Sequence, residues 1–335
     1  MPLQSASDFY RADQRRKLLA IQAVRREWNK LPEPSAWNQR TLQRIVALVS
    51  AAQIGAAEDA DRYVPNALRE QGIATSPSGV TNSAGFAGIA YGFREGDAFD
   101  GYPLETVVNL APGLAEARGV TALEKMAAGQ AFLDMMTHWQ IAEASSAAVQ
   151  ANITWRNQMG WLRVVSPPCC KDCAVQAGKW FAHNEGFDRH PHCDCYHVPA
   201  PRNANAVELA PTPPLDQITG LNKAEQQAIA DGADFNQVVN AGRGRVAGGN
   251  LTLEGTSRRG WASYMRREID AQQGVQTATT VERARTGRRN VARTKRRLTP
   301  KAIYRVSATR EEAIRRLIEN GYMVGDLTKL ARLVS

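Results

Sequence analysis

All five cysteines of the chain, and three of its five histidines, fall within the stretch CCKDCAVQAGKWFAHNEGFDRHPHCDC. Cys170 and Cys173 form a Cys-x2-Cys pair, and His190 and Cys193 repeat that spacing farther along the chain. Two such pairs can close a tetrahedral shell of sulfur and nitrogen ligands, which is the geometry that Zn²⁺ prefers in structural sites. The stretch therefore predicts a structural Zn²⁺ site with Cys170, Cys173, His190 and Cys193 as its first set of ligands.

Other ligand sets, and other uses of these cysteines, stay open. Cys195 could replace His190 or Cys193, and Cys169 could replace Cys170. A disulfide framework is disfavoured because the cysteine count is odd and the sequence shows no signal peptide. A redox Cys-x-x-Cys would need a βαβ context, which we do not find. A catalytic zinc keeps one coordination position open, whereas this segment offers spare ligands.

The length and charge of the chain limit the remaining possibilities. Its 335 residues predict two or three domains. No apolar run approaches the roughly 18 residues that cross a membrane, so we expect a soluble protein, intracellular at synthesis and without membrane contact. The net charge is +9, and residues 281–305 alone hold ten Lys and Arg against one acidic residue. The remainder of the chain is therefore nearly neutral.

The basic segment 281–305 has two interpretations. It could contact the phosphate backbone of DNA without reading sequence, because its irregular spacing indicates neither base readout nor stacking on single strands. It could equally be a solvated arm, or one that docks on an acidic protein surface. The candidate binding residues are Arg283, Arg285, Arg288, Arg289, Arg293, Lys295, Arg296 and Arg297.

Apolar spacing predicts a mainly α fold with a small zinc-stabilised α+β module, a long N-terminal helical hairpin and a basic C-terminal extension. We divide the chain into a helical hairpin (1–71), an irregular excursion (72–118), a helix with the zinc knuckle (119–200), a Pro/Gly-rich linker with a short helix (201–255) and a basic arm with a terminal helix (256–335).

Individual elements follow from the same patterns. Long helices are predicted over 8–29, from Ser35 to about Glu70 and from near Val120 past Gln150, with short helical pieces at 83–91 and 103–110. Strands are predicted at Trp161–Val165 and around Trp180 and Phe181, and a linker at 198–214. Later helices are predicted at Lys223–Ala241 and Thr309–Asn320, the last with a capping box and with Gly321 as its C-cap.

Several motifs point together to one family. They are Ser166-Pro167-Pro168, Cys170-x2-Cys173-Ala174-Val175, Gly178-Lys179-Trp180, Gly186-Phe187-x-Arg189-His190-Pro191, Cys193-Asp194-Cys195, and in the tail Glu254–Gly260, Leu298-Thr299-Pro300, Ile303-Tyr304-Arg305, Arg310–Ile314 and Gly321-Tyr322. Through them the chain resembles the phage Mu F-like minor head proteins of the type common in actinobacteriophages. Cys169 lies outside the family pattern. Family members often carry Asn or Arg at the position of His192, and commonly Arg at that of Asp194.

The resemblance implies a head-morphogenesis role. Some relatives are fused to a capsid maturation protease or carry toxin domains; this sequence shows neither a Ser/His/Asp arrangement nor an ADP-ribosylating site, so we expect no enzymatic activity. Such proteins are minor capsid components, present in few copies at the portal vertex inside the virion head after assembly in the host cytoplasm. Their expected partners are the portal protein, the major capsid or scaffold protein and, through the basic arm, packaged double-stranded DNA.

Two alternatives compete with this expectation. One is a zinc module that binds DNA without sequence preference outside a capsid. The other is a metal-dependent nuclease in which His183, His190, His192 or His197 activates water. The cysteines disfavour the nuclease, because the metals of nucleases prefer oxygen and imidazole ligands.

Overall fold

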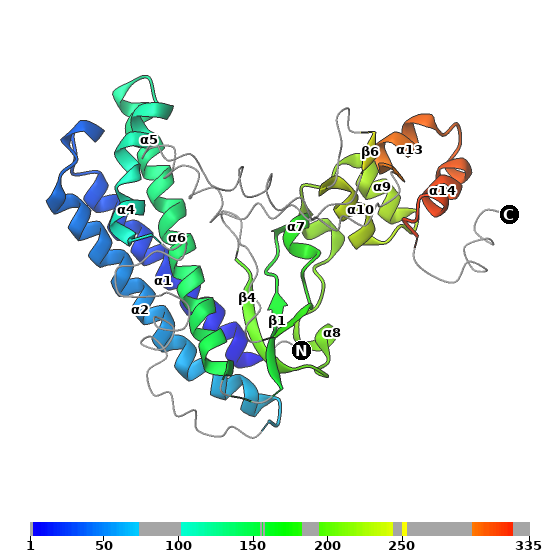
Figure 1. Ribbon diagram of the computed structural model, residues 1–335, viewed down its shortest axis with the longest axis horizontal. Helices are drawn as coiled ribbons and strands as arrows, with labels where there is room; N and C mark the ends of the chain where they lie inside the picture. The colour runs from blue at the N-terminus through cyan, green and yellow to red at the C-terminus, as the bar shows by residue number, and fades with distance from the viewer. Residues whose placement is uncertain are drawn as a thin grey trace, which may run out of the picture. The chain divides into compact units, whose positions relative to one another are not determined.

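The computed structural model describes residues 3–73, 102–154, 156, 158–182, 194–243, 250–252 and 297–323. These residues form two compact units, which we treat separately (Figure 1). The helical unit holds the described residues up to Ser166 and those of Ala177–Thr212. The C-terminal unit holds Pro167–Gln176 and the described residues from Pro213 onward.

Three long helices pack along one another in the helical unit: α1 (Gln4–Trp28), α2 (Gln39–Glu70) and α6 (Ala122–Thr154). A short 3-10 turn, η1 (Pro34–Ala36), reverses the chain between α1 and α2 (Figure 1). The Asn38 side chain caps α2 by accepting a 3.1 Å hydrogen bond from the backbone N–H of Thr41. The predicted hairpin and the predicted long third helix are therefore present.

Small side chains determine how closely the helices pack. The contacts of α2 with α6 are rich in buried alanine, and the second half of α6 is buried on nearly every side. Short side chains at a helix–helix contact reduce the distance between the axes. The buried alanines of the two helices are Ala52, Ala56, Ala57, Ala60, Ala67, Ala142, Ala144, Ala147, Ala148 and Ala151.

Two further helices lie where the sequence predicted an irregular excursion. Helix α4 (Leu104–Val108) and helix α5 (Leu110–Arg118) bury Leu104, Val107 and Leu114 in the same core as Trp28. Helix α4 confirms the short helical piece predicted at 103–110, whereas α5 was not predicted within 72–118. Pro112 lies in the first turn of α5, where proline is tolerated. The piece predicted at 83–91 lies outside the described residues.

An antiparallel sheet of order β3-β1-β4 packs at the end of the bundle where α6 terminates (Figure 1). It consists of β1 (Met159–Val164), β3 (Trp180–Ala182) and β4 (Tyr196–Pro201). The predictions of β1 and β3 are confirmed within two residues. The predicted linker was wrong at its start, because β4 pairs with β1 along its length. Proline fits here because β4 is an edge strand, where a missing N–H donor costs little. A short helix, α8 (Ala206–Leu209), follows.

The C-terminal unit consists of short elements around a core that contains Val238, Ile303, Leu317 and Tyr322. Its elements are β2 (Cys169–Cys170), α7 (Lys171–Ala174), η2 (Leu215–Gln217), β5 (Ile218–Thr219), α9 (Lys223–Ala230), α10 (Phe235–Arg243), β6 (Leu251–Thr252), β7 (Arg297–Leu298), α13 (Pro300–Val306) and α14 (Arg310–Glu319). Strand β2 pairs with β5 in parallel, and β6 pairs with β7 antiparallel.

A segment of this unit that was predicted to form one helix forms two. The apolar spacing over Lys223–Ala241 predicted a continuous helix, but the chain turns between α9 and α10. Gly232 adopts a φ of +102° there, a left-handed backbone conformation that ends α9. Sequence spacing alone missed this break because both halves keep their apolar side.

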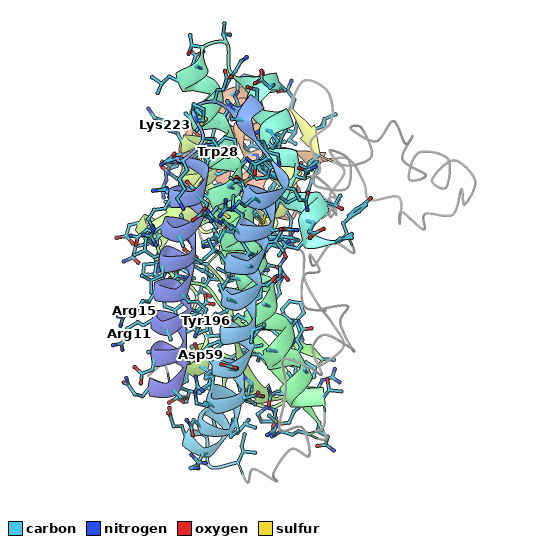
Figure 2. All side chains as sticks on the ribbon, turned by 90° about the vertical axis from the view of Figure 1, so that its left-hand side faces the viewer. Arg11, Arg15, Trp28, Asp59, Tyr196 and Lys223 are labelled. Carbon is cyan, nitrogen blue, oxygen red and sulfur yellow. The ribbon has the colours of Figure 1, made fainter. Side chains whose placement is uncertain are left out.

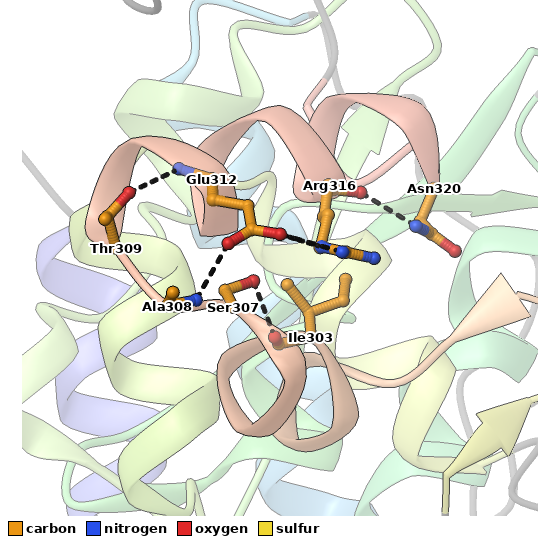
Figure 3. A network of polar contacts seen from close by, with 7 residues as sticks. All are labelled: Ile303, Ser307, Ala308, Thr309, Glu312, Arg316 and Asn320. Carbon is orange, nitrogen blue, oxygen red and sulfur yellow. Dashed lines mark hydrogen bonds and ion pairs between the residues drawn. The ribbon is translucent and has the colours of Figure 1, made fainter.

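The terminal helix α14 is confirmed together with its caps (Figure 3). Thr309 Oγ1 accepts from the N–H of Glu312 at 3.2 Å, while the Glu312 carboxylate accepts from the N–H of Ala308 at 2.8 Å. In a capping box the Glu side chain accepts from the N–H of the N-cap residue itself. Here Glu312 accepts instead from Ala308, one residue before the N-cap Thr309. Gly321 follows with a φ of +69°, as a glycine C-cap requires.

The described residues are mainly helical with a small sheet, which confirms the coarse fold class. None of the described helices has the length and apolar character needed to cross a membrane.

Candidate metal-binding segment

The first cysteine pair forms a tight turn in the C-terminal unit. Cys170 is the N-cap of α7, and its Sγ accepts a hydrogen bond from the backbone N–H of Cys173 at 3.3 Å. Cys173 is buried and Cys170 is half-buried. An N–H donor aimed at sulfur stabilises the charged thiolate form, which is the form that binds metal. The turn places both cysteines of the pair at the N-terminus of α7.

Two contacts attach this turn to other parts of the C-terminal unit. Cys169 and Cys170 pair in β2 with Ile218 and Thr219 of β5. Lys171, between the two cysteines of the pair, places its Nζ 3.0 and 2.9 Å from the carboxylate oxygens of Glu225, whose side chain is 4 % exposed.

Glu225 also belongs to the cap of α9. It completes a capping box with Asn222, accepting from the Asn222 N–H at 2.9 Å. The Cys-x2-Cys turn is therefore tied to the start of α9 by a buried ion pair.

In the helical unit, Cys195 lies just before β4 and is buried. Arg163 of β1, also buried, donates from Nη2 to Cys195 Sγ at 3.3 Å. Next along the chain, the ring of His197 stacks on Trp161 with the centroids 3.6 Å apart, and it is 2 % exposed. A guanidinium beside a sulfur favours the thiolate. The His197 ring, in contrast, is enclosed in the core, which gives it little access to water.

Asp194, between Cys193 and Cys195 in the sequence, contacts both α1 and α6. Its Oδ1 lies 2.8 Å from Nε2 of His138 and accepts from Nε2 of Gln14 at 3.0 Å. Lys17 Nζ is 3.8 Å from the same oxygen. Burial raises the pKa of Asp194, but the hydrogen bond from His138 and the charge of Lys17 outweigh it and hold that pKa below its ordinary value.

A buried ion pair lies beside these contacts. Lys17 Nζ is 2.6 Å from Oδ2 of Asp13 one turn earlier on α1, and the two side chains are 4 % and 11 % exposed. A cavity of about 10 Å³, large enough for one water molecule, is bordered by this pair, Ser145 and Cys195. The start of β4 therefore rests on a polar cluster within a largely apolar bundle.

Tyr196 adds an aromatic contact to the same segment. Its ring lies against that of Tyr10 on α1, with the centroids 5.1 Å apart. Burial, assisted by Tyr10, raises the pKa of Tyr196 to about 12. In Figure 2, Arg11 and Arg15 point away from the bundle on the outer side of α1, which leaves its opposite side for these contacts.

The described residues bring only part of the predicted ligand set together. Cys170 and Cys173 share one turn, and Cys195 is placed by Arg163, whereas His190 and Cys193 lie outside the described residues. Within the described ranges, no group of three or more His, Cys, Asp or Glu side chains is arranged to hold a metal. No disulfide joins any two of the four described cysteines.

Among the predicted basic binding residues, only Arg297 is described, and it contacts other parts of the C-terminal unit. Its guanidinium donates to the carbonyl oxygen of Asn320 at 2.9 Å and to Oε1 of Gln237 at 3.0 Å. The guanidinium carbon lies 4.2 Å from the ring centroid of Tyr322. The other seven residues, Arg283, Arg285, Arg288, Arg289, Arg293, Lys295 and Arg296, lie outside the described residues.

Sequence reasoning missed the contacts that hold the cysteines. Arg163 was a visible signal, because it is a charged residue inside an otherwise apolar strand. The pairing of Asp194 with His138, and that of Lys171 with Glu225, joins residues 56 and 54 positions apart, which no local pattern reports.

Comparisons with protein-family models, with curated proteins and with solved structures found no match to this chain.

Proposed function

We propose that this chain is a minor head protein of a tailed phage and that its cysteine segment holds a structural Zn²⁺. Two things support the proposal: the motifs shared with the Mu F-like family, and the geometry of Cys170 and Cys173. The 3.3 Å bond from the Cys173 N–H to Cys170 Sγ carries the metal part, because it closes the Cys-x2-Cys turn at the start of α7.

The zinc would be held by Cys170 and Cys173 together with His190 and Cys193, or with Cys195 in place of one of the last two. When bound, it would supply no chemistry of its own. An apparent binding energy of about 10 kcal/mol is comparable with the stability of a whole domain, so the metal would fix the segment 170–195 where the local core is small.

The role in the virion follows from the resemblance. We infer that the protein enters the procapsid from the host cytoplasm, docks at the portal vertex inside the head through the portal, capsid or scaffold protein, and assists assembly, DNA packaging or ejection. The three packed helices α1, α2 and α6 would offer a docking body for such a role.

The basic residues from Arg283 to Arg296 would then face packaged DNA or an acidic protein surface. If they neutralise phosphates, each contact adds about 0.9 to the slope of log affinity against log salt. Arg297 is engaged within the C-terminal unit, so we do not count it among the contacts that the arm would make.

The location is tested with particles purified from a phage whose genome encodes this chain. Quantitative mass spectrometry of procapsids and filled heads should detect peptides of the chain in both, at a few copies per portal ring. If both particles lack the chain although it is expressed in the infected cell, the proposal is wrong.

A further inference from the structure

The outer face of α1 carries two leucines side by side. Leu18 and Leu19 are 56 % and 54 % exposed, whereas the preceding residue, Lys17, is buried in the bundle. The Lys17 ammonium lies 2.6 Å from the carboxylate of Asp13 on the same helix. Exposed leucines that are scattered singly need no explanation, but two that adjoin in one helical turn make a continuous apolar spot. Helix α1 thus turns an ion pair toward the bundle and two leucines toward solvent.

Arginines lie on both sides of this apolar spot along the helix. Residues three and four positions apart are neighbours on a helix surface, so Arg15 adjoins both leucines and Arg11 lies one turn before Arg15. Arg26 follows Leu19 by about two turns. All three arginines are exposed, and Figure 2 shows Arg11 and Arg15 pointing away from the bundle. We call Arg11, Arg15, Leu18, Leu19 and Arg26 together the α1 face.

Most of the positive charge of the α1 face has no acidic partner within the part of the chain that the structure describes. Helix α1 is described over its whole length, and Asp8 is the only acidic residue among its exposed positions. Asp8 lies 3.6 Å from Arg11, with the two side chains 59 % and 70 % exposed, which makes a weak pair in water. Arg15 and Arg26 take part in no ion pair or hydrogen bond among the described residues. The face therefore combines unbalanced positive charge with exposed apolar area.

We propose that the α1 face is a docking surface for an acidic protein whose own surface offers an apolar pocket bordered by carboxylates. Such a partner buries the two leucines while its carboxylates pair with the arginines. The inference rests on the proposed function, because it assigns the surface through which the chain joins another protein of the procapsid.

Two other kinds of partner fit this face less well. Nucleic acid would pair with the arginines, but the same contact would press Leu18 and Leu19 against phosphates, which lose water and gain no hydrogen bond from a leucine. A second copy of the chain, docked through the same face, would set arginine against arginine, and like charges across an interface oppose association. An acidic protein surface satisfies both the leucines and the arginines.

A few residues at the centre of an interface carry most of its binding energy. In the α1 face these are Arg15 and the two leucines beside it, because Arg11 and Arg26 lie at its ends. Burying the exposed half of one leucine side chain changes the affinity about tenfold. Arg15 acts through its charge, so Arg15→Lys should keep most of the affinity whereas Arg15→Glu should oppose docking.

The test uses competition in cells infected by a phage whose genome encodes this chain. A plasmid supplies a second, tagged copy of the full chain, with or without a substitution. Quantitative mass spectrometry compares the ratio of plasmid copy to phage copy in purified procapsids with the same ratio in the cell lysate. We expect the double variant Leu18→Ala/Leu19→Ala and, separately, Arg15→Glu to lower the procapsid ratio about tenfold or more. Arg15→Lys should enter procapsids nearly as well as the unmodified tagged chain.

The matched controls make the same kinds of substitution elsewhere in the helical unit. Leu123→Ala removes a leucine that is 81 % exposed, and Arg40→Glu reverses the charge of an exposed arginine of α2. Both should leave the procapsid ratio unchanged. Thermal unfolding of all purified variants should match that of the unmodified chain, since surface substitutions change stability little.

The outcomes separate this inference from the proposed function. If Leu18→Ala/Leu19→Ala enters procapsids as well as the unmodified chain, the α1 face is not the docking surface, and the proposed function stands. The inference also fails if only one of the two changes lowers the ratio; an effect of Arg15→Glu alone would indicate a purely electrostatic partner such as nucleic acid. If the unmodified chain itself is absent from procapsids, the proposed function fails and the inference with it.

Discussion

The indole of Trp28 occupies the space beside Gly129, so that a Cβ at this glycine would lie 2.3 Å from Cζ2 of the ring. The ring cannot easily withdraw, because Nε1 of Trp28 donates to the carbonyl oxygen of Met126 at 2.9 Å and the side chain is fully buried. Helices α1 and α6 therefore pack closely at this contact because Gly129 has no side chain.

Gly129→Ala should destabilise the helical unit. Alanine is the better helix former by about 1 kcal/mol, but crowding in a packed core costs about 1–3 kcal/mol, so the net change is unfavourable. Gly55→Ala on α2 is the control, since a Cβ there meets the flexible end of Arg16. Urea denaturation followed by circular dichroism should show a lower midpoint for Gly129→Ala alone. Equal midpoints would mean that the Trp28 contact does not limit the packing.

Arg297→Lys should destabilise the C-terminal unit although the charge is kept. The planar guanidinium reaches Asn320 and Gln237 while lying over Tyr322, and a lysine ammonium cannot reproduce that combination. We expect a loss of about 1–2 kcal/mol in the free energy of unfolding. Arg305→Lys, at an exposed position of α13, should cost nothing measurable. Arg297→Lys should leave the affinity of the chain for DNA unchanged. A loss of DNA affinity with unaltered stability would contradict the structural role of Arg297.

Alkaline pH should weaken the same unit through Tyr322. Burial raises the pKa of this phenol to about 12, partly offset by Arg297, and its hydroxyl donates to the carbonyl oxygen of Leu298 at 2.7 Å. The unfolded phenol ionises near pH 10, so the unfolded state loses its proton first as the pH rises from 10 to 12. The contribution is fully present below pH 10 and is lost through that window, on the order of 2 kcal/mol.

Tyr322→Phe provides the comparison for this effect. It should remove that part of the pH dependence, which urea midpoints at pH 9 and pH 11.5 would show as a smaller drop than in the unmodified chain. Identical drops in the two proteins would place the effect on other groups.

The sequence predicted those helices and strands whose formation depends on residues close together in the chain. The three long helices, β1, β3 and the capped α14 follow from apolar spacing and cap residues, which act within a few positions of the chain. Strand β4 could not be predicted from such signals, because Pro199 and Pro201 argue against a strand until its pairing with β1 is known. Helix α5 was missed for a similar reason, since its stability comes from burial beside Trp28.

The candidate site divides in the same way. The spacing of Cys170 and Cys173 predicted a metal-binding pair; the structure contains a turn there, closed by the bond from the Cys173 N–H to Cys170 Sγ, and the metal stays a prediction. The partners that place the segment, Arg163 for Cys195 and His138 for Asp194, come from distant parts of the chain and are selected by tertiary packing. A single sequence names the candidate ligands but not the groups that orient them.

The metal content of the purified full chain tests the zinc proposal most directly. We expect elemental mass spectrometry to find one zinc per chain after gel filtration, retained in Cys169→Ser and lost in Cys170→Ser and Cys193→Ser together with part of the folded signal. A folded chain with no bound metal, and with stability unaffected by Cys170→Ser, would contradict the structural zinc site.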